Sequence, residues 1–261
     1  MVEMKAHYNP QIIEASQKEL STFSRWMNTY YGHYPTIVGG WAVYAHLSKA
    51  TSELGKANLG STRMGFVPLG SRDIDVVFAA HSTMDTILMT YFKHNGFVAE
   101  KKFLEISYVK EVKTPLGVEQ IFIDACTLSD VREIPGLKVK IPWNLVGKNN
   151  ELFSFDGKTK IYIPTVELLL MQKIGACIGR TLQRKTSPSS YLESKIWKDC
   201  YDFVNLATRI SFNQSNLKKF LKQIKLEKHM DLFFSEIQDQ RDVLIEANVA
   251  VNELKQKMGY S

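Results

Sequence analysis

The sequence predicts an α/β (α+β) fold, in which a mixed β-sheet flanked by helices is followed by a helical region. Two patterns support this class. Between residues 35 and 126, runs of β-branched and aromatic residues alternate with segments whose apolar residues recur at helical spacing. After residue 164, nearly all of the chain has helical spacing. We therefore expect an α/β domain over residues 1–162 and a helical domain over residues 163–261.

Local patterns place the individual elements of the first domain. In chain order they are a helix over 9–31, a strand over 35–38, a helix over 41–49, a strand over 73–78, a helix over 83–94, and two strands over 103–112 and 118–126. Turn-forming residues between the last two strands predict a hairpin. Glycines and a proline predict a mobile loop over 51–70, and residues 129–160 are expected to be irregular. Breaks near 185–190 and 211–215 divide the helical domain.

Composition narrows the class of protein. Of the 261 residues, 44% are hydrophobic and 23% are charged, which is ordinary for a globular protein and argues against disorder. The formal net charge of +6 favours an anionic partner such as a nucleotide or nucleic acid. Three cysteines without CxxC spacing argue against a disulfide framework and against structural zinc. The sequence has no apolar run long enough to span a bilayer, so we expect a cytoplasmic protein without membrane contact.

Two aspartates on one predicted strand are the first chemical signal. On a strand, Asp73 and Asp75 share one face, while Ile74 and Val76 share the other. Two such carboxylates can bind a divalent cation that prefers oxygen ligands, and their mutual repulsion calls for a metal or a basic neighbour. The alternative is a strand end that faces solvent, where Asp-x-Asp is common.

Two further features add to this pair. Gly39 and Gly40 lie between a predicted strand and a predicted helix, where backbone N–H groups can approach a phosphate. A tight turn without a ligand explains the same glycines. Asp124 follows Ile121 and Ile123 on a later strand and lies on the opposite face from them. An acidic residue in such a run needs a partner, which a metal shared with Asp73 and Asp75 would supply.

Together these residues resemble the signature of the DNA polymerase β-like nucleotidyltransferases. That signature is Gly-Gly before a helix, Ser-x-Asp-x-Asp on a strand and a single Asp on a later strand. The corresponding positions are Gly39, Gly40, Ser71, Asp73, Asp75 and Asp124. The resemblance implies that the three aspartates are catalytic, that they bind two Mg²⁺ ions that hold a nucleoside triphosphate, and that Asp124 helps to activate the attacking hydroxyl. It also implies that the two glycines and Ser71 contact the nucleotide.

The helical half is similar to the AbiEii-type toxin nucleotidyltransferases, the toxin half of some bacterial and archaeal toxin–antitoxin pairs. The match rests on a Leu-x-x-Lys helix that contains Lys173 and Arg180, and on the later segment Lys-Asp-x-x-Asp at 198–202. By this resemblance Lys173 contacts the triphosphate and is catalytic, Arg180 supports it, and Asp199 or Asp202 completes the nucleotide site. The alternative is a solvated basic face with a local ion pair between residues 198 and 202.

The expected activity is therefore transfer of a nucleoside monophosphate from an NTP to a hydroxyl, with release of pyrophosphate. RNA, and tRNA in particular, is the expected acceptor, and an antitoxin protein is an expected partner by the same resemblance. The alternatives are a small-molecule (aminoglycoside-like) or protein nucleotidyltransferase, and a catalytically silent module that binds RNA or a partner. Lysines at 218, 219, 222, 225 and 228 are interpreted as a solvated helix face that could contact RNA phosphates.

Overall fold

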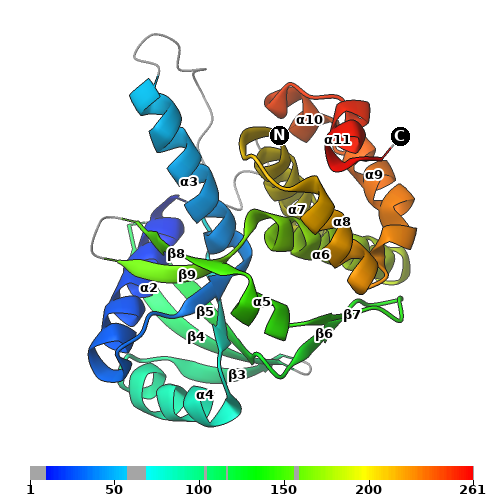
Figure 1. The fold of residues 1–261 in the computed structure, drawn as a ribbon. Coiled ribbons are helices and arrows are strands. Elements are labelled where there is room, and N and C mark those ends of the chain that lie inside the picture. The colour runs from blue at the N-terminus through cyan, green and yellow to red at the C-terminus, as the bar shows by residue number, and fades with distance from the viewer. Residues whose placement is uncertain (1–9, 58–68, 103–104, 116, 156–158, 261) are drawn as a thin grey trace.

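The computed structural model describes residues 10–260 except 58–68, 103–104, 116 and 156–158 (Figure 1). Its strands are β1 (Thr36–Val38), β2 (Asp73–Phe78), β3 (Val98–Lys102), β4 (Glu105–Thr114), β5 (Gly117–Thr127), β6 (Val131–Glu133), β7 (Lys140–Pro142), β8 (Asn150–Ser154) and β9 (Lys160–Pro164). Its helices are α2 (Pro10–Tyr31), α3 (Gly39–Ala57), α4 (His81–Ile87), η1 (Leu88–Phe92, a π-helix), α5 (Asn144–Lys148), α6 (Val166–Thr186), α7 (Ser190–Arg209), α8 (Gln214–Gln223), η2 (Leu226–His229, a 3₁₀ helix), α9 (Met230–Asp239), α10 (Arg241–Ala247) and α11 (Val251–Met258).

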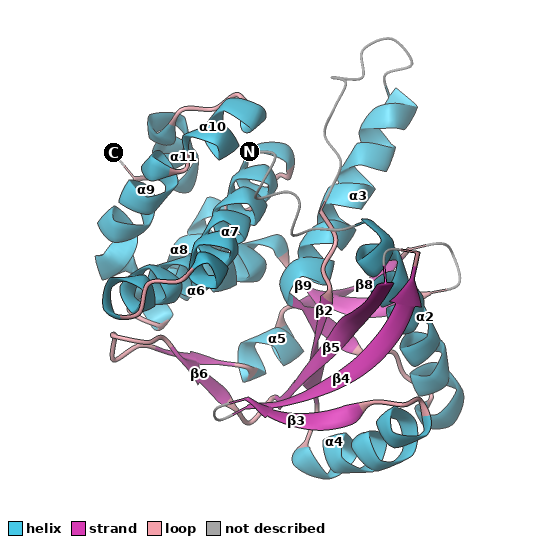
Figure 2. Ribbon diagram, turned by 180° about the vertical axis from the view of Figure 1, so that it is seen from behind, coloured by secondary structure: helices cyan, strands magenta, loops and turns pink. Residues whose placement is uncertain are grey.

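Seven strands form one mixed sheet in the order β3-β4-β5-β2-β1-β9-β8. Strand β2 is central: it runs parallel to β5 and antiparallel to β1, and β1 is in turn parallel to β9. A largely helical region follows this sheet, so the predicted fold class is confirmed. Figure 2 shows the helical region beside the sheet, with α9 and α11 on the side of α6 and α7 that is away from the strands.

Helices α2 and η1 cover one face of the sheet. The Phe23 ring of α2 lies 5.0 Å from the Tyr91 ring of η1, and Phe92 stacks on Tyr108 of β4 at 5.0 Å. On this face Ile74 of β2 and Ile121 and Ile123 of β5 are fully buried. The other face of β2 carries Asp73 and Asp75, as their alternation with buried neighbours requires.

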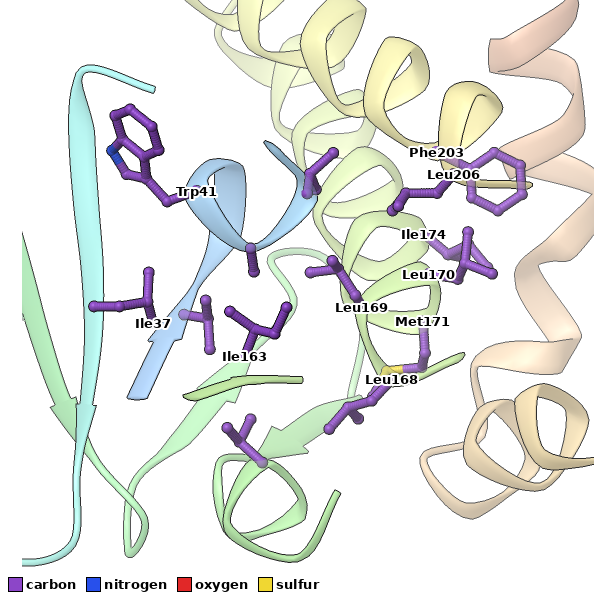
Figure 3. Close-up of a cluster of buried hydrophobic side chains, with 14 of the residues drawn as sticks. Ile37, Trp41, Ile163, Leu168, Leu169, Leu170, Met171, Ile174, Phe203 and Leu206 are labelled. Atoms are coloured by element: carbon purple, nitrogen blue, oxygen red, sulfur yellow. The ribbon is translucent and has the colours of Figure 1, made fainter. Parts of the chain in front are cut away.

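The apolar core continues from the sheet into the helical region through α6. Figure 3 shows consecutive leucines of α6 reaching toward both sides: Leu169 lies near Ile163 of β9, while Leu170 lies near Phe203 and Leu206 of α7. All five side chains are fully buried. A helix that is apolar on several faces is typical of a position between two layers, and α6 therefore connects the sheet to the helices. The predicted domain division at residue 162 stays a prediction.

Several boundaries differ from the expectation. Residues 51–57 continue helix α3 instead of forming a loop, because a single interior glycine weakens a helix without ending it; residues 58–68 lie outside the described part. The segment 129–160 contains β6, β7, α5 and β8 instead of being irregular, since short strands depend on distant pairing partners that local patterns do not reveal. Strand β3 was not predicted. In the described residues, no helix has the length and apolarity needed to cross a membrane.

Candidate active site

The register of the sheet brings two of the three predicted carboxylates side by side. In the parallel pair β2–β5, Asp75 lies directly opposite Asp124. On the far side of β5, Ser107 of β4 lies opposite Asp124 in the antiparallel register. Neighbouring strands are roughly 4.8 Å apart, so Asp75, Asp124 and Ser107 form a row across three strands. Asp73 lies two residues before Asp75 on the same face, and we call Asp73, Asp75 and Asp124 the aspartate cluster.

The turn from β1 to α3 closes against this cluster. Gly39 has a φ of +65°, and a Cβ at that position would overlap the Asp75 Oδ2 atom. Glycine therefore meets two requirements here, a left-handed backbone and close approach of a carboxylate. A Cβ on the next residue, Gly40, would lie 2.8 Å from the Ser71 Cβ and 3.0 Å from its Oγ. The predicted phosphate-binding glycines and Ser71 thus line the same edge of the cluster.

Asp75 and Asp73 differ in how their charge is compensated. Burial, followed by the neighbouring charges of Asp124 and Asp73, raises the pKa of Asp75 to about 7. No described residue forms a hydrogen bond or ion pair with the Asp75 side chain. Asp73 accepts a hydrogen bond from Lys195 Nζ at 2.8 Å and lies 3.4 Å from Arg72 Nε. Burial alone would raise the pKa of Asp73, but Lys195 and then Arg72 outweigh it, so that pKa is lowered.

Asp124 has a hydroxyl partner. The Ser107 Oγ donates a hydrogen bond to Asp124 Oδ1 across the β4–β5 pair. Both side chains are on the face that carries Asp73 and Asp75, opposite Ile121 and Ile123, which are fully buried. The hydroxyl fixes the orientation of the Asp124 carboxylate next to Asp75.

Helices α6 and α7 present a second charged group, the α6–α7 ion cluster, to the same region. Its members are Lys173, Arg180, Lys198, Asp199 and Asp202. Lys173 Nζ lies 2.7 Å from Asp202 Oδ2 and 3.3 Å from Asp199 Oδ1, and Arg180 pairs with Asp199. Burial alone would lower the pKa of Lys173, but Asp202 and Asp199 outweigh it and raise that pKa. Each buried charge in this cluster therefore has a partner of opposite sign, as burial requires.

Electrostatics connect the two clusters. The charges of Lys173 and Lys195 both act to lower the pKa of Asp75, although burial and the other aspartates prevail. In return, burial alone would lower the pKa of Arg180, but Asp199 and, to a smaller extent, Tyr191 and Asp75 raise it. The aspartate cluster on the sheet thus faces cations from α6 and α7. Residues that are about 100 positions apart in the sequence share one electrostatic environment.

The predicted site residues fall into two groups. Gly39, Gly40, Ser71 and the aspartate cluster come together on one face of the sheet. Lys173, Asp199 and Asp202 are buried and paired with one another, so the solvated basic face considered from the sequence is wrong. The local pairing of Lys198 with Asp202 is present. Arg184, which lies on α6 with Lys173 and Arg180, pairs with Glu193 and Glu236.

Two residues of the site were missed from the sequence. Lys195 contacts Asp73 from a helix 122 positions away, and Ser107 contacts Asp124 from the neighbouring strand. Lysine and serine are common surface residues, so their types carried no signal. The hairpin register between β4 and β5, if it had been predicted residue by residue, would have identified Ser107 as the partner of Asp124.

The side chains do not form a complete metal centre in these positions. Among the described residues, no three His, Cys, Asp or Glu side chains are arranged to hold an ion. Asp73 is turned to Lys195 and Asp124 to Ser107. In type and placement, however, the aspartate cluster fits a hard divalent cation, since it offers carboxylate oxygens from adjacent strands. Burial and then the charges of Asp124 and Asp73 raise the pKa of Asp75, and such a cation would neutralise those charges.

Comparison with known proteins adds nothing to this geometry. No family model matches the sequence. No curated protein matches it either. The roles assigned to individual residues therefore rest on the contacts, burial and charges above.

Replacing Asp75 with asparagine should remove a specific pH dependence of stability in buffer without divalent cations. Because the folded-state pKa of Asp75, about 7, is above its ordinary value of 3.8, the folded protein keeps a proton that the unfolded chain has lost. Stability therefore falls as pH rises toward 7 and levels off above it. Relative to Asp75→Asn, the wild type should lose about 1–2 kcal/mol of unfolding free energy between pH 5.5 and 8, less than full burial would give because the side chain is partly exposed.

Urea denaturation at both pH values measures this difference. Asp85→Asn, an exposed position on α4, is the matched control and should keep the wild-type dependence. Parallel pH profiles for wild type and Asp75→Asn would show that Asp75 ionises normally.

Proposed function

We propose that this protein is a Mg²⁺-dependent nucleotidyltransferase that transfers a nucleoside monophosphate from an NTP to a hydroxyl acceptor. The observation that carries the proposal is the row formed by Asp75 and Asp124 on adjacent strands, with Asp73 on the same face. The glycine turn at residues 39–40 and cations from α6 and α7 surround this row. Its resemblance to the DNA polymerase β-like superfamily, closest to the AbiEii type, supports the same activity.

The aspartate cluster would hold the metal ions, two by the resemblance. Bound Mg²⁺ supplies charge neutralisation for the triphosphate and makes a coordinated hydroxyl more acidic. In the protein without metal, Lys195 provides the cation beside Asp73, and Asp75 relieves repulsion by taking up a proton. Metal binding is therefore expected to compete with the Asp75 proton and with the Lys195 contact.

The reaction needs the acceptor oxygen to attack the α-phosphorus while the bond from that phosphorus to the bridging oxygen of the β-phosphate breaks. Pyrophosphate leaves with the electron pair of that bond, and the proton of the acceptor hydroxyl passes to a base. Asp124 is suited to receive this proton, because Ser107 holds its carboxylate in place on the face of the sheet that carries Asp73 and Asp75. The backbone N–H groups at the start of α3, at Gly39 and Gly40, are suited to bind phosphate oxygens.

Two cations remain accessible beside the aspartates. The side chains of Arg180 and Lys195 are 26% and 23% exposed, against 10% for Lys173. These two cations would stabilise the negative charge that develops on the leaving pyrophosphate. Lys173, which the resemblance places on the triphosphate, is held by Asp199 and Asp202 and contributes its charge from a buried position.

RNA, and tRNA in particular, is the proposed acceptor, since the net charge of +6 favours a polyanion and the AbiEii resemblance points to tRNA. An antitoxin protein is the partner that this resemblance adds. A reducing cytoplasm supplies NTPs and tRNA, and the free thiols of Cys126, Cys177 and Cys200 suit it.

Purified protein incubated with Mg²⁺ and total RNA should transfer label from one of the four α-³²P-labelled NTPs, each tested separately. Asp75→Asn should lower this transfer by at least about 100-fold, because the amide cannot replace a carboxylate that binds cations. Gel separation of labelled RNA measures the outcome. Asp85→Asn controls for the substitution itself and should transfer at the wild-type rate.

Two results would redirect or overturn the proposal. Label on a small molecule or on protein, with none on RNA, keeps the transfer chemistry and replaces the acceptor. Absence of label on every acceptor offered, or label that survives in Asp75→Asn, contradicts the enzymatic function and favours a silent binding module.

An exposed tyrosine at the start of α7 is placed to hold the nucleobase. Tyr191 is 62% exposed, and its ring centroid lies 5.5 Å from Lys195 Nζ, the group that contacts Asp73. An exposed aromatic ring this close to a cation beside the aspartates can stack on the base of a bound nucleotide, which is worth about 1–3 kcal/mol. We expect Tyr191→Ala to raise the KM for NTP about 10-fold and to change kcat less than 3-fold.

Tyr191→Phe keeps the ring and should keep the wild-type KM, so a steady-state comparison of the two variants isolates stacking from hydrogen bonding. Equal KM values for Tyr191→Ala and wild type would remove Tyr191 from the nucleotide site.

A further inference from the structure

A second feature of the molecule is a basic hollow on the helical region, away from the aspartate cluster. It encloses about 630 Å³ and is lined by Lys218, Lys219, Lys222, Glu227, Lys228 and Tyr260. We call it the basic hollow. It lies between α8, η2 and the residues that follow α11. These elements belong to the helices that Figures 1 and 2 place beside α6 and α7.

The lining has a strong excess of positive charge. Four lysines against Glu227 give a net charge of +3 (four minus one). On α8 the buried positions Leu217 and Leu221 face the core, which leaves the lysines on the outer side. Lys218 and Lys222 are neighbours at i,i+4, a spacing at which like charges destabilise a helix. The protein therefore keeps these cations together at an electrostatic cost that an anionic ligand would relieve.

The lysines differ in how they are held. Lys218 Nζ donates a hydrogen bond to the Gly259 carbonyl at 2.7 Å and lies 5.6 Å from the centre of the Tyr260 ring. In the described part of the chain, Lys219, Lys222 and Lys228 form no ion pair, and all three are exposed. Three exposed ammonium groups beside one that is held by a hydrogen bond suit a ligand that carries several negative charges.

The aromatic side of the hollow is fixed in position. The Tyr260 ring packs edge-on against Phe234, with ring centroids 5.8 Å apart. The chain before it is tied to α8, because Gln214 Nε2 donates to the carbonyls of Gln256 and Lys257. Tyr260 is partly exposed, so part of this held ring remains open to a ligand. Lysines that surround a fixed tyrosine are the combination with which proteins bind single-stranded nucleic acid, phosphates on the cations and a base on the ring.

We propose that the basic hollow binds single-stranded RNA, with phosphates on Lys219, Lys222 and Lys228 and a base stacked on Tyr260. This inference deepens the proposed function, on whose RNA acceptor it rests, by assigning a surface that holds the body of the acceptor. The hollow lies on helices that follow α6 and α7, whereas the transfer chemistry lies on the sheet. A ligand that reaches both must be long, which favours a polynucleotide over a small anion.

Binding without catalysis tests the surface. Fluorescence anisotropy of a labelled 20-nucleotide single-stranded RNA, in buffer without Mg²⁺, should give at least about 10-fold weaker binding for Lys219→Glu/Lys222→Glu than for wild type. The salt dependence should also become shallower, by about 1.4 in the slope of log K against log salt for two lost phosphate contacts. The charge-matched control Lys93→Glu/Lys148→Glu, at exposed positions outside the hollow, should bind within about 3-fold of wild type. Tyr260→Ala should weaken binding about 10-fold, while Tyr260→Phe should not.

The outcomes separate this surface from the proposed activity. Asp75→Asn should bind RNA as wild type does, so loss of transfer with intact binding leaves the hollow assigned.

Equal weakening by both lysine double variants would attribute binding to net charge and overturn the proposal. Poly-glutamate that competes as well as RNA would identify an acidic protein as the ligand instead. Thermal melts of each variant check folding, which the substitutions at exposed lysines and Tyr260→Phe should not change.

Discussion

The repulsion between Asp75 and Asp124 is the constraint on which the rest of the site depends. Parallel pairing of β2 with β5 fixes the two carboxylates side by side on one face, and Asp73 adds a third negative charge nearby. Neither strand can shift by one residue to relieve this, because a shift would move Ile74 and Ile123 out of the core. The fold therefore holds like charges close together, and burial, followed by the charges of Asp124 and Asp73, raises the pKa of Asp75 to about 7.

Cations of the helical region partly compensate the negative charge of the aspartate cluster. Lys195 of α7 reaches Asp73 on the sheet, and this ion pair spans the two halves of the molecule. Lys173 and Arg180 of α6 are held by Asp199 and Asp202 of α7. These two cations therefore keep their positions without forming ion pairs with the aspartate cluster on the sheet. The apolar core that runs through α6 sets the distance between the two layers. Packing thus decides where charges meet, and the charges leave one carboxylate, Asp75, available for a cation.

Features of the fold and the site could be predicted from the sequence where they depend on residues that are close together in the chain, and could not where they depend on distant ones. Periodicity located the central strand and its aspartates, since alternation between Asp73, Ile74 and Asp75 is local. The glycine turn was also local, and its close approach to Asp75 explains both its composition and its backbone. Lys195 and Ser107 were missed because their roles come from tertiary contacts. The short strands in 129–160 were missed for the same reason, since each depends on a partner strand.

The central claim is that the aspartate cluster exists to bind a divalent cation, and diffraction from crystals grown with Mn²⁺ and a non-hydrolysable NTP tests it most directly. We expect anomalous density between Asp75 and Asp124, close to the oxygen distance of about 2.0–2.1 Å that Mg²⁺ adopts, with Lys195 displaced from Asp73. Saturating Mn²⁺ that leaves the cluster empty, with Lys195 still bound to Asp73, would contradict it.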